Sequence, residues 1–169
     1  NAGVTFNNSA PVIYGGNFVN NGTTSAPPTQ EYRANFINTG TFTGGYGIST
    51  FNGSVAQQIT GATTFTNLEL NNSAGLTINS NVTVQTQLNL GGVLTTGSNT
   101  LTFADLSNIG VTRTSGWVAG NLCARTYSWN HTRLYPIGDS TAYRPLTVDF
   151  AGVSAAGYVT ASISQAGGD

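Results

Sequence analysis

Acidic side chains, which do the catalytic work in most glycan-cleaving enzymes, are scarce in this sequence. Such enzymes use a pair of carboxylates, or several acids around a calcium ion with a basic residue nearby. No two of the acidic residues lie within four positions of each other; they are Glu31, Glu69, Asp105, Asp139, Asp149 and Asp169. We therefore predict that the chain is not an enzyme and has no catalytic residues, with a polysaccharide-cleaving enzyme as the alternative.

Cys123 and His131 are the single cysteine and the single histidine of the chain. A nucleophilic cysteine needs a base and an orienting group beside it, and with one residue of each kind the two would have to meet in space. The simpler interpretation makes Cys123 a small buried residue and places His131 in a surface loop, with a disulfide between two chains through Cys123 as an alternative. The sequence predicts no metal site and no cofactor.

Aromatic side chains gather in the C-terminal part of the sequence, and a flat ring matches the apolar face of a sugar ring. The candidates for a ligand-binding platform are Trp117, Tyr127, Trp129, Tyr135 and Tyr143. The other interpretation is that these rings fill the core of the C-terminal part. The arginines among them are expected to pair with Asp139 and Asp149.

Charge is the unusual quantity of the composition. Only 7% of the residues are charged, against about a quarter in an average domain, and the net charge is −1 with no lysine. Nucleic acids and anionic membranes are bound through clustered cations, so neither is an expected partner. No apolar run approaches the roughly 20 residues that span a bilayer, so no membrane insertion is expected. A Thr-, Asn- and Gly-rich chain without lysine is typical of extracellular or cell-surface proteins.

Two repeats indicate how the chain folds. The segment Asn17–Gly22 returns as Asn35–Gly40, eighteen residues later. Apolar residues also recur at a step of six, and three of them begin a pair spaced as on one face of a strand. These residues are Leu76, Val82, Leu88 and Leu94, with Ile78, Val84 and Leu90 as the partners. A β-solenoid with three short faces per turn would explain both numbers.

We accordingly predict an all-β fold, since no segment has helical apolar spacing. Residues 1–112 are expected to form a β-solenoid, or parallel β-helix, with right-handed coiling favoured. Its corners are expected where Gly and Asn cluster, at 71–72, 91–92 and 97–99. The segment Ala26–Glu31 contains two prolines and is interpreted as a loop that bulges from one turn.

Residues 113–169 have longer strand candidates joined by short turns, which favours antiparallel pairing. We expect a small antiparallel, sandwich-like unit that caps the end of the solenoid.

The segments Phe65–Ile78, Asn81–Val84 and Gly92–Leu101 resemble the repeat regions of very large secreted surface proteins of Bacteroidetes-type bacteria. Two further segments, Gly116–Leu122 and Tyr135–Thr147, are similar to the module that follows those repeats. The resemblance covers roughly residues 51–150. It implies an adhesin-like or fibre-forming protein that is exported to the cell surface, and it brings no catalytic residues.

The sequence thus predicts a non-catalytic extracellular structural or adhesive protein. An open solenoid end at Gly3–Phe6, without lysines to protect its edge, favours end-to-end association of copies into a surface filament. The alternative is a carbohydrate-binding or polysaccharide-active β-helix module that uses the C-terminal aromatic residues.

Overall fold

The structure of the protein is a computed structural model, and it describes residues 4–5, 10–105 and 110–163. In these ranges every regular element is a β-strand, so the prediction of an all-β fold is confirmed. The same residues include no helix that is long and apolar enough to cross a membrane.

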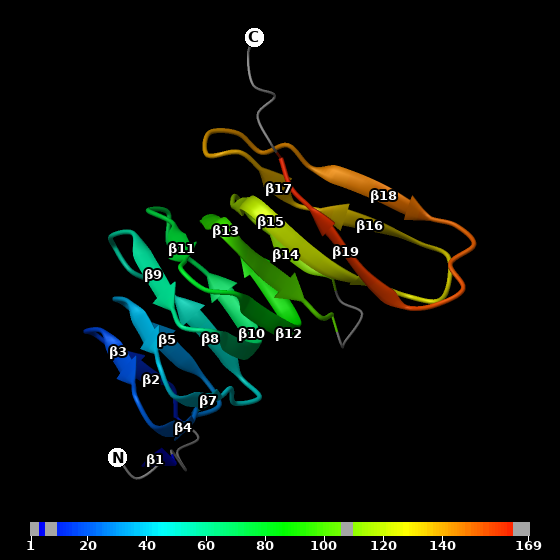
Figure 1. The fold of residues 1–169 in the computed structure, drawn as a ribbon. Helices are drawn as coiled ribbons and strands as arrows, with labels where there is room; N and C mark the ends of the chain where they lie inside the picture. Colours follow the sequence, from blue (N-terminus) through cyan, green and yellow to red (C-terminus); the bar gives the residue numbers. More distant parts are fainter. Residues whose placement is uncertain (1–3, 6–9, 106–109, 164–169) are drawn as a thin grey trace.

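The chain coils into a parallel β-solenoid of about six turns, as predicted, and each turn contributes short strands to three faces (Figure 1). Face A consists of β2 (Val12–Tyr14), β5 (Gln30–Tyr32), β8 (Ile48–Phe51), the ends of β10 (Thr63–Leu70) and β12 (Val82–Leu90), and β14 (Val111–Arg113). Face B consists of β3 (Phe18–Asn20), β6 (Phe36–Asn38), β9 (Gln57–Thr60), β11 (Leu76–Ile78), the beginnings of β13 (Val93–Phe103) and β15 (Trp117–Thr126), and β17 (Ile137–Gly138).

Face C closes each turn. It consists of β1 (Val4–Thr5), β4 (Thr23–Ser25), β7 (Thr41–Thr43), the beginnings of β10 and β12, and the ends of β13 and β15. The strands β10, β12, β13 and β15 are long because each continues around a corner from one face to the next.

Strand register explains both sequence repeats. Phe18 pairs with Phe36, eighteen residues later, so the Asn-Phe echo marks one full turn. The length of a turn varies along the chain: paired residues are 23 apart at Phe36 and Ile59, 18 apart at Leu76 and Leu94, and 24 apart at Val93 and Trp117. All seven apolar residues of the six-residue repeat are buried, which confirms that they point into the solenoid.

The core changes character along the solenoid. In the first turns, aromatic rings stack from one turn to the next on face A. Tyr14 lies parallel to Tyr32 at 5.1 Å between ring centroids, and Tyr32 lies 5.1 Å from Phe51. In the later turns aliphatic residues take these places, as where Leu70 pairs with Leu90. Apolar burial along this continuous ladder is the main stabilising contribution.

Buried polar side chains of the first turns satisfy one another. The Asn20 side-chain amide donates to Asn38 Oδ1 at 2.8 Å, and the Asn38 amide donates to Thr63 Oγ1 at 3.2 Å. A buried amide without a partner would cost about 1–3 kcal/mol, so this ladder removes a penalty and fixes the register of face B.

Glycine is required where the backbones of successive corners nearly touch. A Cβ on Gly92 would lie 2.0 Å from the Asn72 carbonyl oxygen, and one on Gly116 would lie 1.9 Å from the Gly92 carbonyl oxygen. These contacts stack the corners between faces A and B. The corners predicted at 71–72, 91–92 and 97–99 are all present, the last with Gly97 at φ 56°.

The segment Ala26–Glu31 is less of a loop than predicted. Gln30 and Glu31 belong to β5, inside the stack. Gln30 is buried, its amide donates to the Pro27 carbonyl, and its carbonyl oxygen accepts from the Tyr32 hydroxyl. The prolines therefore shape only the approach to the strand.

The parallel stack continues past residue 112, because β14 and β15 form a further turn and β17 pairs in parallel with the beginning of β15. The antiparallel unit follows, as β19 (Gly157–Ala161) pairs with β15, and β16 (His131–Tyr135) pairs with β18 (Leu146–Phe150). The sequence pattern makes β15 look like one long hairpin strand. It is two solenoid strands joined at Gly120, which adopts φ 127°.

Candidate functional site

The five aromatic residues predicted from the sequence lie in three places. Tyr127 and Trp129 stack on each other with centroids 4.4 Å apart and ring planes 2° from parallel. Trp117 and Tyr143 form a second, tilted pair at 6.4 Å. Tyr135 is fully buried in the core. The structure therefore does not assemble the five rings into one platform.

The pair of Trp117 and Tyr143 belongs to a tightly bonded turn. Trp117 Nε1 donates to the Asp139 carbonyl at 2.8 Å, and the Arg113 guanidinium lies 3.8 Å above the Tyr143 ring. Arg144 donates to the Asp139 carboxylate at 2.7 Å, which confirms the expected pairing of an arginine with Asp139. This arginine, with hydrogen bonds from Thr141, holds the pKa of Asp139 well below its usual range. The interactions here stabilise the turn.

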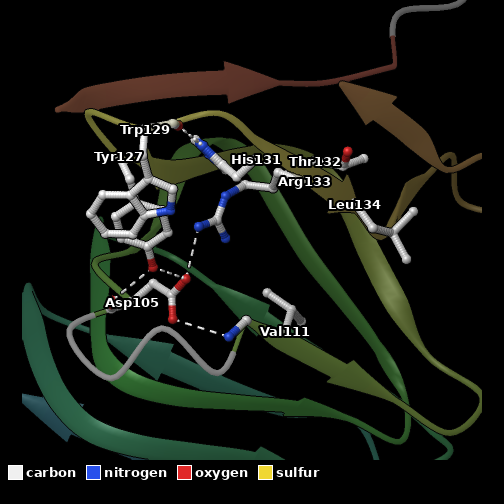
Figure 2. Close-up of a pocket in the computed structure, with 9 residues that line it drawn as sticks. Asp105, Val111, Tyr127, Trp129, His131, Thr132, Arg133 and Leu134 are labelled. Atoms are coloured by element: carbon white, nitrogen blue, oxygen red, sulfur yellow. Dashed lines mark hydrogen bonds and ion pairs between the residues drawn. The ribbon is translucent and has the colours of Figure 1, made fainter. Parts of the chain in front are cut away.

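The other pair borders a pocket of about 320 Å³ between the end of β13 and strand β16 (Figure 2). The residues that line it are Asp105, Gly110, Val111, Tyr127, Trp129, His131, Thr132, Arg133 and Leu134. We call this the Trp129 pocket.

The side chains of β16 alternate with a charged residue, and not the neighbouring apolar one, on the buried side. Arg133 is only 7% exposed, whereas the neighbouring Leu134 is 48% exposed. An apolar-in, polar-out reading of this strand would give the opposite orientation. The reason is a charged partner, since Arg133 Nη2 lies 2.8 Å from Asp105 Oδ2.

Asp105 is held by three hydrogen bonds. The Tyr127 hydroxyl and Arg133 donate to Oδ2, at 2.5 and 2.8 Å, and the Gly110 N–H donates to Oδ1 at 3.0 Å. Burial alone would raise the pKa of this carboxyl, but the bonds from Tyr127, Arg133 and Gly110 outweigh it and lower the pKa below its usual value. Asp105 is therefore ionised at neutral pH. It also has φ 48°, a conformation that non-glycine residues adopt at a cost.

His131 differs from its predicted place in a surface loop. It begins β16, is half-buried, and stacks on Phe150, the residue opposite it on β18, at 4.9 Å. Its Nδ1 lies 2.8 Å from the Trp129 carbonyl oxygen. Among the residues that the structure describes, two buried atoms of the pocket find no hydrogen-bond partner, namely His131 Nε2 and Arg133 Nε.

Cys123 lies on β15 and is half-buried, so it is more exposed than the buried position predicted for it. It is not among the residues that line the Trp129 pocket. In the described part of the chain no three His, Cys, Asp or Glu residues come close enough to hold a metal ion.

The pocket combines an exposed aromatic ring, an ion pair and unpartnered polar atoms, which is an arrangement suited to binding. Both oxygens of the Asp105 carboxylate already accept hydrogen bonds, so this group is poorly placed to act as a base. The sequence analysis missed Asp105 and Arg133 because they are 28 residues apart and no local pattern links them.

Comparison with protein families, with curated proteins and with solved structures finds no match for this chain.

Proposed function

We propose that the chain is a non-catalytic structural or adhesive module of an extracellular or cell-surface protein. The observation that supports this most directly is the continuous parallel stacking of β2 through β15. Each turn adds about 4.8 Å of length and is joined to its neighbour by backbone hydrogen bonds and a shared core. Such a stack is a stiff spacer whose length depends on the number of turns.

The surface of the solenoid supports the same proposal. Outward positions carry hydroxyl and amide side chains, which also bond between turns. Thr39 donates to Asn21 Oδ1 at 2.7 Å, and Asn79 donates to Gln58 Oε1 at 3.1 Å. A neutral polar surface of this kind tolerates changes of salt and pH better than one held by ion pairs.

The proposal includes association of copies through the end of the stack. Among the described strands, β2 and β3 are the terminal strands of their faces. Within residues 4–5, 10–105 and 110–163, no strand pairs with their outer edges, and each carries one exposed apolar residue, Ile13 and Val19. With no lysine in the chain, the usual protection of such edges is missing.

Two assays test the functional class. In the first, beads coated with the protein flow over a panel of surface polysaccharides and proteins. More of these beads should be retained than of beads coated with an unrelated neutral protein. In parallel, reducing-sugar release from the same polysaccharides should stay at the level of the blank. Sugar release above the level of the blank would show an enzyme and overturn the non-catalytic role.

A further inference from the structure

Trp129 offers one ring face whose orientation is fixed. Its other face packs on Tyr127, and its carbonyl bonds to His131, yet 51% of the residue is exposed. Holding a large aromatic surface in water is unfavourable unless something covers it. A rigid, half-exposed indole is a common anchor for ligands, because little conformational freedom is lost when it binds.

The polar wall of the pocket has one unused donor and one unused acceptor. The Trp129 carbonyl can only accept, so His131 Nδ1 carries a proton, and in that tautomer Nε2 is an acceptor. Arg133 Nε–H is a donor, on a side chain that is more than nine-tenths buried. A hydroxyl group both accepts and donates, so polyhydroxy ligands can satisfy both atoms.

The charge of the pocket favours a neutral ligand. Arg133 and Asp105 are oppositely charged and directly bonded, so the guanidinium is already neutralised. A carboxylate or phosphate would meet the Asp105 carboxylate together with Arg133 and gain little from either. Figure 2 shows Arg133 extending toward Asp105, with Trp129 and His131 on the same side of the pocket.

We propose that the Trp129 pocket binds one ring of a neutral saccharide. The apolar face of the sugar stacks on the outer face of Trp129, and its hydroxyl groups bond to Arg133 and His131. The pocket volume of about 320 Å³ lies at the lower end of the usual range for small-molecule sites, which suits one sugar ring. This inference goes beyond the structural role and stands or falls separately from it.

The two tryptophans of the chain provide a direct test by NMR. Each gives one indole N–H resonance, and Trp117 is tied to the Asp139 carbonyl outside the pocket. The probes are methyl glycosides of glucose, galactose, mannose and N-acetylglucosamine, with methyl glucuronide as an anionic probe. At least one neutral glycoside should shift the Trp129 resonance saturably below about 50 mM, with the Trp117 resonance unchanged.

Variants identify the groups that bind. Trp129→Ala should weaken binding at least tenfold, and His131→Ala about threefold or more, with circular dichroism and the remaining NMR spectrum confirming the fold. The matched control is Tyr158→Ala, because Tyr158 is a half-exposed aromatic residue on β19 outside the pocket. It should leave the affinity unchanged.

Three results would overturn the proposal. One is the absence of any saturable shift with the neutral glycosides. Another is binding that survives Trp129→Ala, and the third is binding of methyl glucuronide alone. None of these results determines whether protein-coated beads are retained under flow. The saccharide site and the adhesive role can therefore be tested separately.

Discussion

The pair formed by Asp105 and Arg133 illustrates how a charged residue is accommodated in this nearly uncharged chain. Burying a single ion is costly, and the cost is offset only when all of its bonding capacity is used. Asp105 meets that condition through Tyr127, Arg133 and Gly110. The pair also joins the end of β13 to β16, so it links the solenoid to the antiparallel unit.

Asp105→Asn should destabilise the fold by about 3–5 kcal/mol near pH 7, because it leaves the buried Arg133 charge unpaired. The pKa of Asp105 is lower in the folded chain than its ordinary value of 3.8. The ionised carboxylate therefore contributes stability above pH 3.8, and that contribution is lost as the pH falls through the folded pKa. Urea unfolding should show the difference between wild type and variant narrowing from pH 7 toward pH 2.

The matched control for this prediction is Asp149→Asn. Asp149 is exposed and accepts one long hydrogen bond, 3.4 Å from Thr132. Its replacement should change stability by less than about 0.5 kcal/mol. If the stability loss of Asp105→Asn is equally small, or does not depend on pH, the role given to the ion pair is contradicted.

For single residues, the sequence shows which side chains are candidates for the site better than it shows where they lie in the fold. It identifies the aromatic residues of the C-terminal part as candidates, and two of them, Tyr127 and Trp129, do line the pocket. It cannot separate these from Tyr135, because an apolar-in pattern would turn Leu134 inward, whereas the buried residues of β16 are Arg133 and Tyr135. The inward position of Arg133 depends on its ion pair with Asp105, which is distant in sequence.

The elements of the solenoid were predictable where their inward residues are apolar. The six-residue repeat predicts β11, β12 and β13, since Leu, Ile and Val fill the inside of those turns. The strands β4, β5 and β8 escape prediction because inward positions are Thr24, Gln30 and Ser49. Thr24 bonds to Asn20, and Gln30 bonds to Pro27 and Tyr32, all within the same turn. Polar residues at inward positions leave no apolar alternation to mark these strands.

Corner glycines control the close stacking of these elements. Gly92→Ala should cost at least about 1–3 kcal/mol, because the added Cβ would lie 2.0 Å from the Asn72 carbonyl oxygen and the backbone would have to move. Thermal or urea unfolding monitored by circular dichroism measures the loss.

Gly15→Ala is the matched control, since a Cβ at Gly15 meets no atom within 4 Å. Its effect should stay within about 0.5 kcal/mol. Equal stability of the two variants would mean that the corners of the solenoid separate easily, contrary to the tight stacking described above.

The whole molecule has two unlike ends. At one end the parallel faces A and B finish in the short strands β2 and β3, and at the other the antiparallel strands β16, β18 and β19 follow the last turn (Figure 1). The sequence predicts two unlike parts because its repeats stop where the arginines and tryptophans begin, but the parallel stack runs beyond that point into β14 and β15. The edge at β2 and β3 is the one that continues the solenoid geometry, so it is the surface through which a second copy would add.

We expect the apparent mass in light scattering to rise with protein concentration, because pairing at the β2 and β3 edges satisfies their backbone groups. The double variant Ile13→Lys with Val19→Lys should remain monomeric over the same range, since both residues are more than half exposed on these strands and two cations there repel a second copy. Thr64→Lys places one lysine on β10, in the middle of the stack and at an exposed position, and should associate as the wild type does. A wild-type chain that stays monomeric at every concentration, or a double variant that associates equally well, would show that this edge is not an interaction surface.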